Sequence, residues 1–323
     1  MAPHRTNSRV VGVILAAGKG TRIYPFSADL PKPILPVCNQ PLLSYQLEFL
    51  KRHGVTDVTI VIGHLGYAIV AALGDGRRWG VNIRYVEQGE TLGMAHAVGK
   101  LEPHIHAPFI LLLGDIYFIT KDMAPMIERV ASGEINACLA SKIEHDPEMI
   151  RRNFAIIPDA DGRVRRVIEK PRHARSTIKG CGLYMFDLNV FDAIRRTPRT
   201  AMRDEYEITD SIQIMIDDEH RVYHSALVDD DMNLTYPHDL LRLNLIELQR
   251  RALPHLVGHD VSMPPGTVID GSVIGDDVVI EHPIRITNSL VFEGTHIAET
   301  HDLDHVVVFG ENIMQCDRAA VGA

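Results

Sequence analysis

Short apolar runs rich in β-branched residues alternate with stretches of helical period from Val10 to about Gln249. Near-continuous apolar strands that alternate with helices are typical of an α/β fold around a mostly parallel, Rossmann-like sheet. The predicted strands are residues 10–15, 57–62, 82–86, 109–113, 135–140 and 182–186, and the predicted helices are residues 41–54, 93–102, 188–196 and 237–253. Ligands of such sheets bind beyond the carboxyl ends of the strands, so we expect functional residues just after strands.

The last part of the chain has a different pattern. Two or three apolar residues, a turn with glycine and another apolar pair recur, at spacings of 17 and 16 residues, in residues 272–280, 289–297 and 305–313. This repeat predicts the stacked coils of a β-solenoid, and a plain small sheet is the alternative. The predicted organisation is a disordered tail (1–9), an α/β domain (10–253) and a short solenoid (254–323).

Composition narrows the class of protein. The 33 Lys and Arg residues against 42 Asp and Glu residues give a net charge of −9, which argues against nucleic acid as a partner. The cysteines are scattered without a C-x-x-C pair, which predicts a reducing compartment without disulfides or a zinc ribbon. No signal peptide and no apolar stretch of about 20 residues is evident, so we expect a cytoplasmic protein without a membrane partner.

A glycine-rich turn with two cations follows the first predicted strand. It reads LAAGKGTR from Leu15 to Arg22, and Lys32 follows between two prolines. Glycines let backbone N–H groups approach phosphate oxygens closely, and two cations can neutralise a triphosphate. The turn matches neither the Walker motif nor G-x-G-x-x-G. It predicts a phosphate cradle, with a solvated basic loop as the alternative.

Polar residues follow three further strands. Asp115 ends the apolar strand FILLL after Gly114 and can hold Mg²⁺ on substrate phosphates, although it can equally cap a helix. Gln88 can pair with a base edge that has adjacent N–H and C=O groups, or it can cap a turn. Glu169 and Lys170 follow a strand-like segment, where a surface ion pair is the default interpretation.

Together these segments resemble the sugar-1-phosphate nucleotidyltransferases, or nucleotide-sugar pyrophosphorylases, and among them the glucose-1-phosphate thymidylyltransferases and uridylyltransferases. The resemblance spans about Val10 to Gln249 and rests on LAAGKGTR…PKP, the family's L-x-x-G-x-G-T-R-…-P-K signature. It implies nucleotide binding by Leu15, Ala16, Ala17, Gly18, Gly20, Thr21, Gln88 and Gly93. It implies sugar-phosphate binding by Glu169, Lys170 and Gly180, and catalytic roles for Arg22, Lys32 and Asp115.

The resemblance also implies Mg²⁺ held by Asp115 and a second ligand. Aligned on Pro237 and the residues after it, the second ligand is Asn233, where many members have Asp. An amide oxygen can still ligate Mg²⁺. Asp231 is the alternative if the register slips by two residues.

The implied reaction is Mg²⁺-dependent nucleotidyl transfer from a nucleoside triphosphate to a sugar 1-phosphate. Gln88 suits uracil or thymine, whereas guanylyl-transferring relatives tend to carry Glu there, so UTP or dTTP is favoured. Glucose 1-phosphate is the expected acceptor by its frequency within the family. Phe154-Ala155 replaces the family's usual Tyr-Gly, and Ile116 stands where many members have Asn or Asp, which bears on sugar identity.

Two other functions remain open: a non-catalytic regulatory subunit that binds nucleotide-sugar, and a guanylyltransferase of the same fold. The presence of Arg22, Lys32 and Asp115 argues against the first, and Gln88 argues against the second. The terminal repeat resembles the left-handed β-helix of hexapeptide type that is appended to many of these enzymes. We expect it to serve assembly or regulation, in a homo-oligomer.

Overall fold

The computed structural model describes residues 10–173, 176–201 and 204–322. The chain divides into two compact units. The sheet unit comprises the described residues up to Gly18 together with Tyr45–Asp231, and the coil unit comprises Lys19–Ser44 together with Met232–Ala323. The predicted tail, residues 1–9, lies outside the described residues. The predicted boundary at residue 253 does not separate these units, because residues 19–44 and 232–253 group with the C-terminal repeat.

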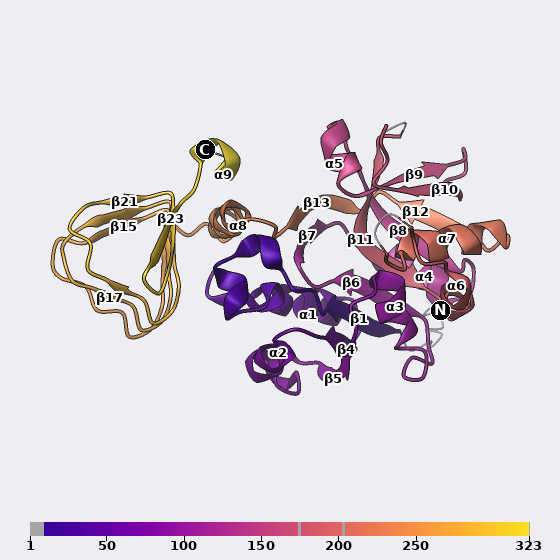
Figure 1. Ribbon diagram of the computed structural model, residues 1–323, viewed down its shortest axis with the longest axis horizontal. Coiled ribbons are helices and arrows are strands. Elements are labelled where there is room, and N and C mark those ends of the chain that lie inside the picture. Colours follow the sequence, from indigo (N-terminus) through magenta and orange to yellow (C-terminus); the bar gives the residue numbers. More distant parts are fainter. Residues whose placement is uncertain (1–9, 174–175, 202–203, 323) are drawn as a thin grey trace, which may run out of the picture. The chain divides into compact units, whose positions relative to one another are not determined.

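A mixed sheet forms the centre of the sheet unit (Figure 1), with the order β10-β9-β11-β6-β1-β4-β5 and with β8 and β12 joined beside β11. Strand β1 pairs in parallel with β4 and β6, and β4 pairs in parallel with β5. Strand β11 is antiparallel to β6, β8 and β9. The strands are β1 (Val11–Ala16), β4 (Asp57–Ile62), β5 (Asn82–Glu87), β6 (Phe109–Leu113), β8 (Ala137–Ile143), β9 (Phe154–Pro158), β10 (Val164–Glu169), β11 (Ile178–Phe186) and β12 (Val222–Ser225). A separate pair consists of β7 (Ile116–Thr120) and β13 (Val228–Asn233).

Helices cover both faces of this sheet. One face carries α3, α6 and α7, whose apolar residues share a buried cluster with Val13 and Leu111. On the other face, a Cβ at Gly12 would lie 2.7 Å from the Leu50 side chain of α1, so the backbone of β1 and this helix are in close contact. The helices are α1 (Leu42–Arg52), α2 (Gly66–Leu73), α3 (Met94–Gly99), α4 (Ala124–Ala131), α5 (Pro147–Arg151), α6 (Asn189–Arg196) and α7 (Ile208–Asp217), with a 3₁₀ turn at η4 (Arg77–Trp79).

The predicted α/β class is confirmed, and so is the parallel arrangement of the N-terminal strands. The predictions for residues 57–62 and 109–113 coincide with β4 and β6. Strand β11 begins at Ile178, four residues before the prediction, because Lys179 and Gly180 interrupt its apolar pattern. Pro41 was expected in the first turn of a helix, but it ends the short strand β3, and α1 begins at Leu42.

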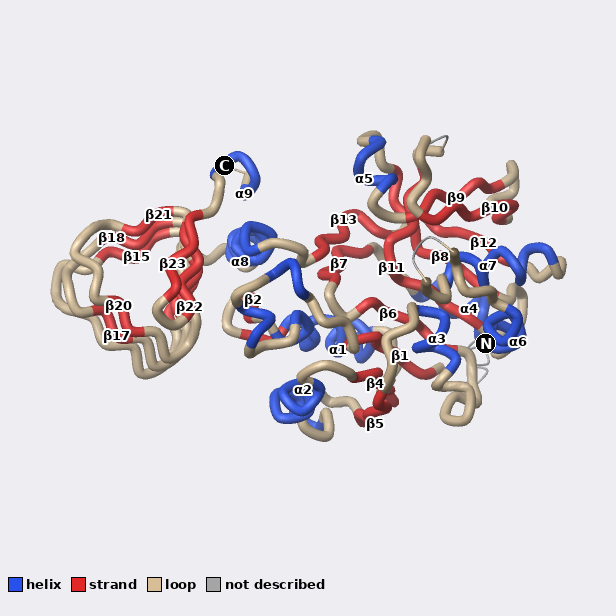
Figure 2. Tube along the Cα trace, viewed as in Figure 1, coloured by secondary structure: helices blue, strands red, loops and turns tan. Residues whose placement is uncertain are grey.

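The coil unit contains a parallel β-helix (Figure 2). Each strand pairs with the one a coil later at a spacing of 17 residues: Val273 lies beside Leu290, which lies beside Val307. The third predicted repeat therefore begins one residue later than its sequence pattern indicates. The strands are β14 (Leu256–Val257), β15 (Val268–Asp270), β16 (Val273–Ile274), β17 (Val279–Ile280), β18 (Arg285–Thr287), β19 (Leu290–Val291), β20 (His296–Ile297), β21 (Leu303–Asp304), β22 (Val306–Phe309) and β23 (Asn312–Gln315).

The rest of the coil unit comes from two sequence-remote segments. The N-terminal segment forms η1 (Thr21–Ile23), η2 (Phe26–Ala28), η3 (Lys32–Ile34) and a hairpin of β2 (Pro36–Val37) and β3 (Gln40–Pro41). The helix α8 (Pro237–Arg250) precedes the β-helix, and α9 (Arg318–Val321) follows it. Helix α8 matches the predicted amphipathic segment, and Asp239 caps it by accepting hydrogen bonds from the N–H groups of Thr235 and Tyr236.

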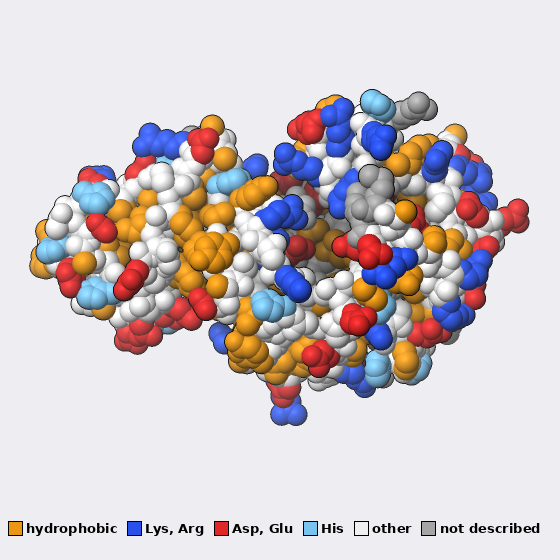
Figure 3. Space-filling view, in the orientation of Figure 1, with side chains coloured by type: hydrophobic (Ala, Val, Ile, Leu, Met, Phe, Trp, Pro, Cys, Tyr) orange, Lys and Arg blue, Asp and Glu red, His pale blue; other side chains and the backbone are white. Residues whose placement is uncertain are grey.

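The remaining chain-wide expectations concern cysteines and membranes. Within the described ranges the cysteines form no disulfide. No helix of the described residues has the length and apolar character needed to cross a membrane. On the face shown in Figure 3, acidic and basic side chains are interspersed.

Candidate active site

The carboxyl ends of β1 and β6 lie side by side and bring two predicted segments together. Leu15 of β1 is paired with Leu113 of β6, and the N–H of Gly114 donates to the Leu15 carbonyl over 2.8 Å. The start of the glycine-rich turn, Leu15 to Gly18, is therefore next to the turn that carries Asp115. This is the edge at which parallel sheets of this kind bind ligands.

Gln46 of helix α1 holds the Asp115 turn, a role that the sequence analysis did not assign. Its side-chain amide donates to the carbonyls of Leu113 and Ile116, each over 2.8 Å. Gln46 is 3% exposed, so these hydrogen bonds are shielded from water. The turn is thereby fixed from both sides of Asp115. A polar residue in the apolar stripe of a predicted helix was the only sequence signal for it.

The predicted base-reading residues follow β5. Gln88 is 7% exposed, and its backbone N–H continues the sheet by donating to the Ile62 carbonyl over 2.9 Å. Gly93 has φ 106°, and a Cβ there would lie 2.5 Å from the carbonyl oxygen of Tyr206. Only glycine fits such a position, because the Tyr206 backbone passes directly against it. Burial lowers the pKa of neighbouring His96, which supports a packed neutral imidazole.

Glu169 and Lys170 stand where β10 ends. Lys170 has φ 40°, and its N–H donates to the Asn153 carbonyl over 2.8 Å. Glu169 accepts a hydrogen bond of 3.3 Å from Thr209 of α7 and lies 3.6 Å from the Lys170 ammonium. The carboxylate is thus oriented by the helix start, while the exposed Lys170 extends from a constrained backbone. Glu207, at the N-cap of α7, is 5% exposed.

Gly180 is covered by an aromatic ring. It is paired with Phe154 across β9 and β11, and a Cβ at Gly180 would come within 1.8 Å of that ring. The close approach of the Phe154 ring explains why residue 180 is a glycine. The predicted contact of Gly180 with the sugar phosphate stays a prediction. Phe154 is also the first of the two residues, Phe154 and Ala155, that replace the family's usual Tyr-Gly.

Two ion pairs at β13 were not predicted. Lys179 and Asp231 have fully buried side chains, and the ammonium donates to Asp231 Oδ1 over 2.6 Å. The more exposed Lys142 donates to Asp230 over 2.7 Å, and this hydrogen bond raises the lysine's pKa although burial opposes the rise. Because Asp231 is enclosed against Lys179, Asn233 is the better candidate for the second metal ligand.

The remaining predicted residues belong to the coil unit. Gly20 has φ 63°, and a Cβ there would lie 2.9 Å from Lys32 Cγ, so the loop folds closely on the lysine stem. Thr21 and Arg22 are exposed in η1, whereas Lys32 is 8% exposed in η3. Asn233 is half-buried at the end of β13.

Two of the predicted residues have side chains that suit a hard divalent cation, one in each unit. Asp115 offers carboxylate oxygens and Asn233 offers an amide oxygen, which are ligand types that Mg²⁺ accepts. Within the described ranges, no group of three or more His, Cys, Asp or Glu residues is arranged to hold a metal ion.

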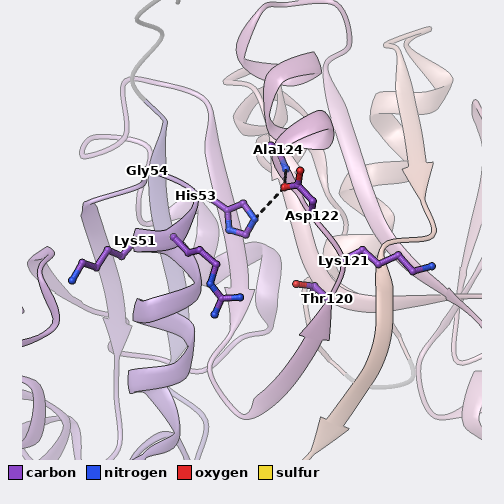
Figure 4. Close-up of a pocket in the computed structure, with 8 residues that line it drawn as sticks. Lys51, His53, Gly54, Thr120, Lys121, Asp122 and Ala124 are labelled. Carbon is purple, nitrogen blue, oxygen red and sulfur yellow. Dashed lines mark hydrogen bonds and ion pairs between the residues drawn. The ribbon is translucent and has the colours of Figure 1, made fainter. Parts of the chain in front are cut away.

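A separate cavity of about 570 Å³ lies in the sheet unit between the end of α1 and the segment after β7 (Figure 4). Its lining includes Lys51, Arg52 and Lys121. His53 lies 3.8 Å from Asp122, which also accepts a hydrogen bond of 2.9 Å from the Ala124 N–H. No residue of the predicted site lines this cavity.

Comparison with known proteins gives the same indication as the motifs. The nucleotidyl transferase family matches residues 11–232. A glucose-1-phosphate thymidylyltransferase of Streptomyces griseus is 32% identical over 302 residues, covering 89% of this chain and 82% of that protein. The UTP–glucose-1-phosphate uridylyltransferase AglF of Haloferax volcanii is 33% identical over 205 residues, covering 63% of this chain and 82% of that protein.

A solved structure supports the fold. It is a Bacillus anthracis protein, provisionally described as a glucose-1-phosphate thymidylyltransferase and crystallised with sucrose. The two chains are 27% identical with a TM-score of 0.65, and the match covers 73% of this chain and 94% of that one.

Proposed function

Because this chain belongs to the nucleotidyl transferase family and is a sugar-1-phosphate nucleotidyltransferase, we propose that it uses UTP or dTTP, glucose 1-phosphate and Mg²⁺. The observation that best supports this proposal is that the start of the glycine-rich turn, Leu15 to Gly18, lies beside the turn that carries Asp115, at the carboxyl ends of β1 and β6. The first supplies backbone N–H groups for phosphates, and the second supplies a carboxylate.

The reaction needs little covalent chemistry from the protein. A phosphate oxygen of the sugar 1-phosphate forms a bond to the α-phosphorus, the bond from that phosphorus to the β-phosphate oxygen breaks, and pyrophosphate leaves. The nucleophile is already ionised at neutral pH, so no general base is required. The protein must align two anions and stabilise the charge of the transition state.

Each proposed role follows from this requirement. Arg22 and Lys32 neutralise phosphate oxygens, and Arg22 can do so through two parallel hydrogen bonds. Asp115 and Asn233 would hold Mg²⁺, which when bound supplies further charge neutralisation on the phosphates. Glu169 accepts hydrogen bonds from sugar hydroxyls, and Lys170 binds the sugar phosphate.

Gln88 accounts for the choice of base. Its amide can donate to a carbonyl oxygen and accept from N3–H of uracil or thymine, which stand side by side. Guanine instead presents two adjacent donors, N1–H and N2–H, which a carboxylate would suit better. UTP and dTTP are therefore both proposed donors, and GTP is not.

The test is release of pyrophosphate from a panel of nucleoside triphosphates and sugar 1-phosphates with Mg²⁺. We expect turnover with UTP or dTTP and glucose 1-phosphate. Turnover with GTP alone would identify a guanylyltransferase. Binding of nucleotide-sugar without turnover for any pair would identify a regulatory subunit. Light scattering of the same preparation tests the proposed homo-oligomer.

A further inference from the structure

The loop with Arg22 and Lys32 is packed against the β-helix and α8, within one compact unit. Residues 19–44 group with residues 232–323 although some 190 positions separate them in the sequence. The catalytic part of our inference rests on the proposed function, which gives this loop its phosphate-binding role. A loop of short 3₁₀ turns needs contacts with other elements to keep one conformation.

A cluster of three rings provides the first anchor. Phe26 of η2 stacks on Phe292, with centroids 5.1 Å apart and ring planes at 7°. Phe309 of β22 meets Phe26 and Phe292 edge-to-face, at 5.5 Å and 5.0 Å. Phe26 is fully buried and Phe292 is 3% exposed. Four residues after Arg22, the loop is therefore fixed to the surface of the β-helix by a specific aromatic contact.

The hairpin after Lys32 provides the second anchor. Its central residues, Cys38 and Asn39, have φ of 46° and 59°, a left-handed conformation that is unfavourable for cysteine. The Asn39 side chain donates to the carbonyl of Ile274 in β16 over 2.8 Å. This hydrogen bond joins the tip of the hairpin directly to the β-helix.

Helix α8 holds the same hairpin through hydrogen bonds from one side chain, Asn244. The fully buried Asn244 accepts from the Cys38 N–H over 2.7 Å and donates to the Pro36 carbonyl over 3.0 Å. The carbonyl oxygen and the NH₂ group of this one side-chain amide therefore both form hydrogen bonds with backbone groups of the hairpin. Such contacts can hold a strained turn that its own sequence does not favour.

Lys32 lies between the two anchors. It stands six residues after Phe26 and six before Cys38, and its stem is packed against Gly20. We infer that Phe292 and Asn244 are positioning residues for Arg22 and Lys32, so that turnover depends on these two contacts of the β-helix and α8 with the loop. If the β-helix served assembly alone, weakening its contact with the loop would leave turnover unchanged.

The main test compares two β-helix variants in the full-length protein. Phe292→Ala removes the ring that touches the loop. Ile286→Ala removes a fully buried side chain from the interior of the β-helix and serves as the matched control. Below the unfolding transition of both variants, we expect Phe292→Ala to lower kcat about tenfold to hundredfold, since small misplacements of charged groups are costly. Ile286→Ala should lower the unfolding midpoint with kcat within about twofold of wild type.

Rescue distinguishes positioning from general loss of structure. Phe292→Tyr keeps the stacked ring and should retain most of the wild-type kcat. Asn244→Ala should lower kcat and raise the KM for the nucleotide, whereas Gln249→Ala, on the exposed face of the same helix, should change neither. Equal kcat for Phe292→Ala and Ile286→Ala would overturn the inference.

A second measurement does not depend on activity. Trypsin cuts after Arg22, whereas Pro33 prevents cleavage after Lys32, so the initial rate of cleavage at Arg22 reports how firmly the loop is held. We expect at least a tenfold faster rate in Phe292→Ala than in Ile286→Ala at the same temperature. If the wild-type protein shows no turnover, the proposed function fails, while the trypsin rates still decide whether the β-helix holds the loop. Equal rates would overturn the inference.

Discussion

Arg22 is the residue with the clearest proposed role, because it is an exposed cation that can bind a phosphate through two parallel hydrogen bonds. Stabilisation of transition-state charge by one such donor is commonly worth about 100-fold to 1,000-fold in rate. We therefore expect Arg22→Ala to lower kcat by about that factor, with little change in nucleotide affinity measured by calorimetry. Lys19→Ala, an exposed lysine of the same loop, is the control. Parallel losses of kcat and affinity would contradict the assignment.

Gln88 carries the prediction about base selection. A glutamate carboxylate cannot donate a hydrogen bond to a carbonyl oxygen of thymine or uracil. That carbonyl oxygen would then face a negatively charged oxygen without a hydrogen-bond donor between them. The loss of one buried hydrogen bond of this kind is worth about 1–3 kcal/mol, or roughly fivefold to 150-fold. We expect Gln88→Glu to reduce kcat/KM for dTTP and UTP by that factor and to improve the relative use of GTP. Steady-state kinetics with unchanged efficiency for dTTP would disprove the base contact.

The buried Lys179–Asp231 pair gives a prediction about stability. Lys179→Met would leave the Asp231 carboxylate buried without its partner, which typically costs about 3–5 kcal/mol. The double variant with Asp231→Leu should recover much of this loss, because no charge then remains buried. Lys142→Met, at the more exposed pair, should cost about 1 kcal/mol or less. Urea unfolding of the variants measures these differences, and a small effect of Lys179→Met alone would contradict the burial.

At the scale of elements, α1 fixes the turn between β6 and β7 through Gln46. Gln46→Leu puts a somewhat shorter apolar side chain in the buried position and removes the donors to Leu113 and Ile116. We expect the Mg²⁺ concentration for half-maximal velocity to rise several-fold, because the Asp115 turn is then free to move. Glu48→Gln, on the exposed face of the same helix, should leave the titration unchanged. If a folded Gln46→Leu protein needs the same Mg²⁺ concentration for half-maximal velocity as the wild type, the Asp115 turn does not depend on the hydrogen bonds from Gln46.

In one strand, tertiary contacts outweigh the low strand propensity of the residues that form it. Strand β11 includes Lys179 and Gly180, which no strand pattern favours, because Lys179 is paired with Asp231 and Gly180 admits the Phe154 ring. Both compensations come from residues distant in sequence. The 17-residue register of the β-helix is likewise set by strand pairing, which corrects the spacing of 16 indicated for the third repeat.

At the scale of the whole molecule, the coil unit is assembled from both ends of the chain. A fragment that ends at Leu253 would keep the predicted α/β domain but lose Phe292 and Phe309, which cover Phe26. We expect this fragment to bind a dye for exposed apolar surface and to be cut by trypsin in the loop of residues 19–35. Resistance to trypsin and activity equal to the full chain would instead support a domain boundary at residue 253.

The sequence alone determined the α/β class and the positions of most strands along the chain, and it predicts a phosphate-binding role for the first loop. These features depend on local signals: apolar periodicity, glycines that admit phosphate, and cations close together in the chain. The sequence predicts roles for Asp115 and Gln88 because each stands just after a strand, but it does not show that the alternative ligand Asp231 is buried against Lys179.

Only the tertiary structure showed what holds these groups. Gln46, Lys179 and Asn244 are polar residues whose partners lie 52 to 208 positions away in the sequence. The contact of Phe26 with Phe292 of the β-helix joins residues that lie still farther apart in the sequence. Periodicity cannot reveal such pairs, because it records which face of an element is buried and not which residue covers that face.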